Sequence, residues 1–159
     1  SGPTKYRFYA HVKDIPEELL NWMDTNPRDQ NLKTDTAKAI IASLENDAVP
    51  YFHLWNRGIL ISADSVTFDN RKNLVEINLD TPTLHGNIDG GHTLKIIIEC
   101  QHKVSDGILS KMPNQYVEVE VIVGLDSPEG LAEARTPVSL WTSRVWKSSG
   151  RALTRSRTS

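Results

Sequence analysis

The stretch HGNIDGGHTLKIII, residues 85–98, gathers residues that can do acid–base, metal and phosphate chemistry between two apolar segments. Gly90 and Gly91 permit backbone angles closed to other residues and let a ligand approach the main chain closely. The apolar residues that follow predict a helix from Gly91 to about His102. The free N–H groups and the positive dipole end at the start of a helix favour phosphate or another anion. The stretch therefore predicts an anion site.

Three side chains of residues 89–93, the DGGHT segment, supply the candidate chemistry. Asp89 can hold a metal ion such as Mg²⁺ or cap the helix, and His92 can donate to a phosphate oxygen or act as a general acid or base. Thr93 can bind an anion through its hydroxyl group. Asp89 and His92 are the candidate catalytic residues. The structural alternative is a tight strand-to-helix turn in which Asp89 is only an N-cap.

A second polar turn, Asn56-Arg57-Gly58, lies between aromatic and aliphatic residues in FHLWNRGILISA. The guanidinium of Arg57 is suited to bidentate contact with phosphate or carboxylate. The alternative is a hairpin turn with a solvated Arg57. If the two turns meet in space, one supplies an anion cradle and the other a cation.

The elements that must position these turns predict an α/β fold with a mixed sheet and flanking helices. Strands are expected at residues 58–63, 74–79 and 116–124, with the DGGHT segment at or just beyond the end of the second. The sharp alternation of YVEVEVIVG makes the third the clearest. The segment from the second strand to the third can form a βαβ crossover. Further helices are expected at residues 13–24, capped by Asp14, at residues 34–47, and after Ser127.

Composition narrows the function classes. The chain has 159 residues, a net charge of −2 and no apolar run long enough to span a membrane. The one cysteine, Cys100, stands among isoleucines and is expected to be buried, which fits a protein of the reducing cytoplasm. Trp22 and Trp55 are expected in the core or at its edge rather than as base-stacking platforms. The histidines lack zinc-site spacing, although His85 and His92 can converge on one metal.

Residues 136–159 differ from the rest of the chain. They hold five basic residues and no acidic one, whereas residues 1–135 hold 13 basic and all 20 acidic residues. In the reading frame shifted by one base, Trp141-Thr142 must encode Asp and Trp146-Lys147 must encode Glu. We therefore predict one core domain, residues 1–135, followed by a Ser/Arg-rich tail translated from a shifted frame. The alternative is a native arm that binds nucleic acid or an acidic partner. Sequencing the parent gene distinguishes the two.

WNRGILISADSV, HGNIDGGHTLKII and LAEAR, in this order, resemble the abortive phage infection family called AIPR over roughly residues 35–135. Proteins of that family are usually much longer, so the chain resembles their N-terminal core. The resemblance implies a role in bacterial anti-phage defence. The residues that match position by position are Asn56, Arg57, Gly58, Asp89, Gly90, Gly91, His92, Thr93 and Arg135.

The DGGHT segment is also similar to the Asp-Gly-Gln-His-Arg signature of defence proteins in the wider ParB/sulfiredoxin-like group. There, strand–turn–helix units of this kind bind nucleotide phosphates. The similarity implies a ParB/sulfiredoxin-like strand–turn–helix unit here. Thr93 stands where that signature has arginine, a departure that bears on any nucleotide-hydrolysing role.

Three functions follow as hypotheses. The first is a module that binds a nucleotide or phosphate, with Mg²⁺-dependent hydrolysis in a longer protein. The second is a nucleic-acid-binding or nuclease domain, favoured if the basic tail is native or if carboxylates cluster around Asp89. The third is a non-catalytic interaction scaffold whose two turns are purely structural. The sequence leaves open whether the chain is an enzyme and whether it forms a homo-oligomer.

Overall fold

The computed structural model describes residues 2–26, 31–125, 136–141, 144–147 and 152–155, with side chains up to residue 125. The strands are β1 (Thr4–His11), β2 (Ile59–Ala63), β3 (Ser65–Asp69), β4 (Leu74–Leu79), β5 (Gly86–Asp89), β6 (Tyr116–Val123), β7 (Thr136–Trp141), β8 (Arg144–Lys147) and β9 (Ala152–Arg155). The helices are α1 (Asp35–Glu45), α2 (Phe52–Trp55) and α3 (Gly91–Ser105), with 3-10 turns at Val12–Asp14 and Glu17–Asn21.

The strands form two sheets, and the larger is mixed. Its order is β5-β2-β6-β1-β8-β9, with β2 parallel to β6 and antiparallel pairs elsewhere. The alternating valines of β6 are buried at Val117, Val119 and Val121, whereas the glutamates between them are only half-buried. The predicted α/β fold with a mixed sheet is therefore confirmed. Its likeness to the ParB group remains a prediction.

The strand at residues 74–79 has the predicted bounds but lies in the other sheet. β2 ends before Asp64, whose N–H donates to the Asn78 carbonyl at 2.8 Å. Beyond Asp64, β3 and β4 form a hairpin and β7 pairs with the free edge of β4. Because both edges of β4 are occupied, it has none left to pair with β2. The prediction that these two strands share a sheet was wrong.

The strand that leads into the DGGHT segment is β5, which the sequence analysis did not predict. β5 pairs antiparallel with β2, and β2 runs parallel to β6. The helix α3 therefore connects two strands that run in opposite directions, so the predicted βαβ crossover was wrong. The predicted start of α3 at Gly91 was correct, and the helix continues three residues past His102.

The N-terminal region also differs from expectation. The chain begins with β1, and the single helix predicted over residues 13–24 is instead two 3-10 turns. Pro16 explains the break, because the residue before proline avoids helical angles and Ile15 is extended at φ −70°, ψ 122°. Asp14 is the last residue of the first turn rather than an N-cap, so that prediction was wrong. The helix at residues 34–47 is α1, capped by the Thr34 hydroxyl.

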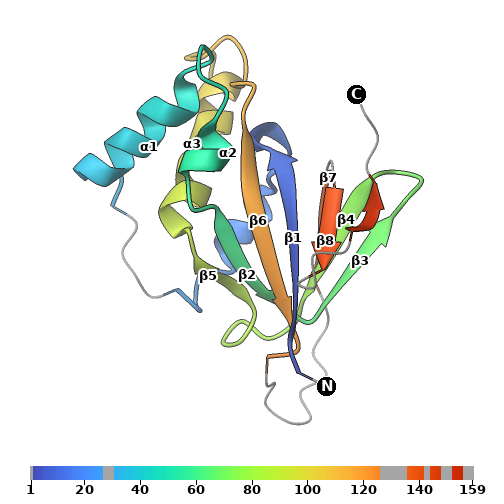
Figure 1. The fold of residues 1–159 in the computed structure, drawn as a ribbon. Helices are drawn as coiled ribbons and strands as arrows, with labels where there is room; N and C mark the ends of the chain where they lie inside the picture. The colour runs from blue at the N-terminus through green and yellow to red at the C-terminus, as the bar shows by residue number, and fades with distance from the viewer. Residues whose placement is uncertain (1, 27–30, 126–135, 142–143, 148–151, 156–159) are drawn as a thin grey trace.

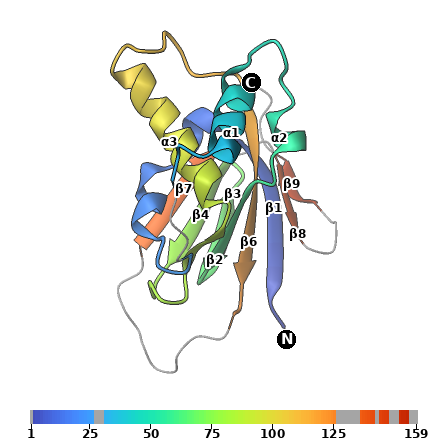
Figure 2. The ribbon, with the colours of Figure 1, turned by 90° about the vertical axis from the view of Figure 1, so that its left-hand side faces the viewer.

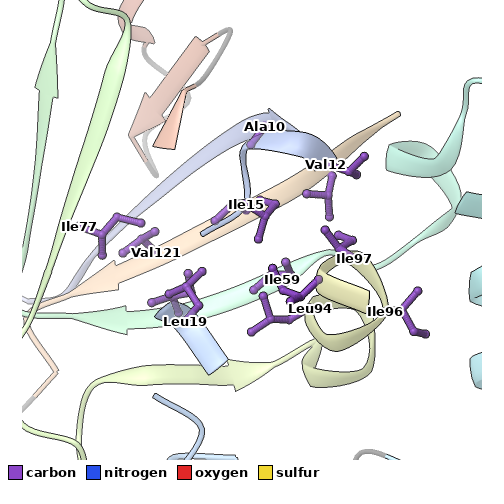
Figure 3. Close-up of a cluster of buried hydrophobic side chains, with 14 of the residues drawn as sticks. Ala10, Val12, Ile15, Leu19, Ile59, Ile77, Leu94, Ile96, Ile97 and Val121 are labelled. Atoms are coloured by element: carbon purple, nitrogen blue, oxygen red, sulfur yellow. The ribbon is translucent and has the colours of Figure 1, made fainter. Parts of the chain in front are cut away.

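The core lies between the large sheet, α3 and the smaller sheet. Leu94 and Ile97 of α3 lie near Ile59 of β2, and Ile77 of β4 lies near Val121 of β6 (Figure 3). Cys100 and Trp22 are buried as predicted, whereas Trp55 is 66% exposed, which corrects its expected place in or beside the core.

The helices gather at one end of the long strands β1 and β6, and the N-terminus lies at the other end (Figure 1, Figure 2). At the helical end β5 finishes and β2 begins, so the two polar turns come together there. Strands β7, β8 and β9 fall in the segment for which a shifted reading frame is predicted, and the frame remains a prediction. The helix expected after Ser127 lies outside the described residues.

Candidate functional site at the start of α3

The two polar turns predicted from the sequence lie against each other. Leu60 is the partner of Asp89 in the β2–β5 ladder, which places residues 56–58 beside residues 89–91. Gly90 has φ +78° and packs so closely on the backbone of Gly58 that a Cβ atom would overlap its carbonyl oxygen. Gly58, at φ +82°, packs in the same way on the Glu118 carbonyl. Both positions therefore require glycine for conformation and for space.

The first turn of α3 is open to a ligand. Gly90 is its N-cap residue, and no side chain caps the helix. Asp89 is therefore not the N-cap; its Oδ1 accepts the N–H of Gly90, at 2.8 Å. The structural alternative for Asp89 as helix cap was wrong. Since the first N–H groups of a helix have no partner within it, those of α3 are directed beyond its end.

The Asn56 side chain ties the two turns together. Its Oδ1 accepts the N–H of Gly58 at 2.8 Å and the hydroxyl of buried Thr93 at 3.1 Å. The Thr93 proton, which the sequence analysis assigned to an anion, is thus donated to Asn56. This arrangement leaves the Asn56 amide group as a donor and gives Thr93 a positioning role.

A buried asparagine that the sequence analysis missed holds the end of β5. Asn87 is fully buried, and its Nδ2 donates to the carbonyls of Asp89, at 2.7 Å, and Leu60, at 3.3 Å. Its Oδ1 accepts from Asn26 Nδ2 at 3.0 Å, and Thr25 donates to its backbone carbonyl at 2.6 Å. These bonds, with that of the Asn87 N–H to the Trp22 carbonyl at 2.8 Å, fix the strand end from which the DGGHT segment departs. No local pattern marked Asn87, because its strand was not predicted and its partners Leu60 and Thr25 lie 27 and 62 residues away.

A cleft of about 300 Å³ opens where these parts meet. Eight of the nine predicted site residues line it, together with four that the sequence did not indicate. The predicted ones are Asn56, Arg57, Gly58, Asp89, Gly90, Gly91, His92 and Thr93, and the others are Asn26, Thr36, Ile40 and Trp55. The ninth predicted residue, Arg135, lies outside the described residues.

Charge in the cleft comes from two exposed side chains. Arg57 makes no ion pair with any described carboxylate, so its guanidinium is available to a ligand. Asp89 is the one carboxylate in the described lining, and half-buried His92 follows it three positions later in the sequence. No group of three metal-binding side chains occurs within residues 2–26 and 31–125. A cation here would take its further ligands from water and from a bound anion.

The other reactive side chains serve the fold. His85 is buried, and its Nδ1 accepts the N–H groups of Asp80 and Thr81 at 3.0 Å each. It does not line the cleft with His92, so the two do not converge on one metal. Burial lowers the pKa of His85 and raises the pKa of the Cys100 thiol.

Comparison with known proteins identifies the family. The family model described as AIPR protein matches residues 23–136, which include both turns and the cleft. The chain belongs to the AIPR family. Membership in AIPR indicates a role in phage resistance. Searches of curated proteins and of solved structures found no match. Among the described residues of this AIPR chain, no helix is both long and apolar enough to cross a membrane.

Proposed function

We propose that this AIPR chain binds a nucleotide or phosphate ligand in the cleft, as part of a phage-resistance system. One observation carries the proposal: Arg57, which pairs with no carboxylate of the described residues, and the start of α3, which no side chain caps, line the same cleft. The helix dipole and free N–H groups favour an anion by roughly 0.3–2 kcal/mol, which is too little for specific binding. Each arginine hydrogen bond to a charged group adds roughly 1.5–3 kcal/mol.

Because Asp89 is negatively charged, phosphate binding in this cleft requires a cation. Its carboxylate repels a bare phosphate, whereas Mg²⁺ bound to that carboxylate and to phosphate oxygens reverses the interaction. Mg²⁺-dependent hydrolysis is the corresponding activity, with Asp89 holding the ion and His92 as general acid or base. The nuclease alternative is favoured by a native basic tail or by a cluster of carboxylates around Asp89. The described cleft lining contains a single carboxylate, that of Asp89.

Calorimetric titration of the full chain with tripolyphosphate and with ATP, each with and without Mg²⁺, tests the proposal. Arg57→Ala is expected to weaken both ligands at least about tenfold, the value of one charge-assisted hydrogen bond. Arg71→Ala is the matched control, because Arg71 is an exposed arginine in the β3–β4 turn, outside the cleft. Equal heats for the parent and both variants would reduce the two turns to structural elements.

A further inference from the structure

Trp55 is exposed where a buried tryptophan was expected. It is the last residue of α2 and is 66% exposed, although a tryptophan ring normally contributes a large area to a core. Tyr51, one turn earlier and 50% exposed, contacts it edge to face, with ring centroids 6.0 Å apart and planes at 67°. This contact orients the indole ring without covering it. Its orientation is therefore set on the surface rather than by core packing.

The ring lies at the cleft. Trp55 and Arg57, two residues apart in the chain, both line it, and the side chain of Ile40 lines it from α1. The cleft thus combines an apolar part, made by Trp55 and Ile40, with a charged part, made by Arg57 and the start of α3. Phosphate alone would satisfy only the charged part. A ligand that satisfies both must carry a flat apolar group at short range from its phosphates.

We propose that Trp55 is a base-stacking subsite and that the ligand of the cleft is a nucleoside phosphate, rather than inorganic phosphate or polyphosphate. This inference rests on the proposed anion-binding function and specifies its ligand. Aromatic rings stack on the π-face that every nucleobase presents, so Trp55 contributes affinity with little discrimination among bases. Arg57 and the N–H groups of α3 hold the phosphates.

The neighbouring Leu54 supplies a matched control. It is 64% exposed on the same helix turn but does not line the cleft. If the exposed side chains of α2 acted only as an apolar surface, Leu54 and Trp55 would be equivalent. A base-stacking role distinguishes them, because only Trp55 can reach a ligand in the cleft.

The experiment titrates the full chain and the variants Trp55→Ala, Trp55→Phe and Leu54→Ala with ATP and with tripolyphosphate, in Mg²⁺. Trp55→Ala is expected to weaken ATP binding about 5- to 150-fold, the range measured for loss of one stacking ring, and to leave tripolyphosphate binding unchanged. Trp55→Phe keeps a ring and is expected to retain most of the ATP affinity. Leu54→Ala is expected to change neither.

A 5′-phosphorylated oligoadenylate, titrated in parallel, distinguishes the source of the nucleotide. If Trp55→Ala loses affinity for the oligonucleotide, the ligand of the cleft is the end of a nucleic-acid strand. If it loses affinity for ATP alone, the ligand is a free nucleotide. Equal weakening of ATP and tripolyphosphate by Trp55→Ala, or no weakening of either, would overturn the stacking subsite while leaving the anion site intact. If the parent protein binds neither ligand, the proposed function is itself refuted.

Discussion

Gly90 packs directly on the backbone carbonyl of Gly58, and this contact joins the two turns that form the cleft. Both residues have positive φ, at +78° and +82°, so each combines a left-handed backbone with a close approach that only glycine permits. The fold therefore requires glycine at positions 58 and 90, whether or not a ligand binds.

Substitution of Gly90 by alanine is expected to destabilise the protein by more than the conformational cost of about 1–2 kcal/mol for a left-handed residue. The added Cβ meets the Gly58 backbone, which cannot move without disturbing β2. Gly107→Ala is the control, because Gly107 has φ +76° and open space around the Cβ position. Urea unfolding of both variants measures the difference. Equal losses would mean that the contact with Gly58 carries no energy.

The bond from Thr93 to Asn56 is expected to hold the start of α3 against the Arg57 turn. Thr93→Val keeps the shape of the buried side chain but removes the donor, at an expected cost of about 0.5–1.5 kcal/mol. Thr93→Ser keeps the donor and is expected to retain anion affinity that Thr93→Val loses. Tripolyphosphate titration of the two variants checks this, and equal affinities would remove the positioning role of Thr93.

Asp89→Asn is expected to change affinity in opposite directions with and without Mg²⁺. Without the ion, loss of the carboxylate removes a repulsion of roughly 1 kcal/mol for unit charges about 4 Å apart in water, so tripolyphosphate binds about fivefold more tightly. With Mg²⁺, the variant is expected to bind tripolyphosphate more weakly than the parent, because it lacks the carboxylate that holds the ion. Asp69→Asn is the control, since Asp69 also accepts backbone N–H groups but lies at the end of β3, outside the cleft. Identical behaviour of the two variants would remove Asp89 from the site.

The buried His85 is expected to make stability fall in mild acid. Burial lowers its pKa, against the opposing charges of Asp64 and Asp80, and its Nδ1 must stay unprotonated to accept two N–H groups. As pH falls below about 6.5, the unfolded chain takes up the proton first, so stability declines by up to about 1.4 kcal/mol per pH unit until the folded pKa is passed. Above about pH 6.5 the contribution is fully present.

His85→Asn places an oxygen acceptor near Nδ1 but cannot titrate, so its stability is expected to decline less steeply over the same range. Urea unfolding between about pH 5 and pH 7 measures the slope. Burial also lowers the pKa of His11, which remains in the variant, so a reduced slope rather than none is expected. If the stability of the variant falls with pH as steeply as that of the parent, a group other than His85 causes the pH dependence.

Local patterns in the sequence were enough for several elements. The valines at every second position of β6 predict a strand with one buried face, and the glycine pair before an apolar stretch predicts the start of α3 at Gly91. Both properties depend on residues close together in the chain, whose backbone preferences and side-chain periodicity act locally. The residue types of the candidate site were visible for the same reason.

Tertiary structure alone decided how these parts meet. Asn56 and Thr93 are 37 residues apart, and their bond depends on the pairing of β2 with β5, which local patterns do not specify. β4 lies in the smaller sheet because its two edges pair with β3 and β7, and this pairing depends on residues far apart in the chain. Trp55 lines the cleft rather than the core because α2, Phe52–Trp55, forms only one helical turn, too short to bury both faces. The sequence by itself determined the chemistry of the two turns, whereas long-range strand pairing decided that they share one cleft.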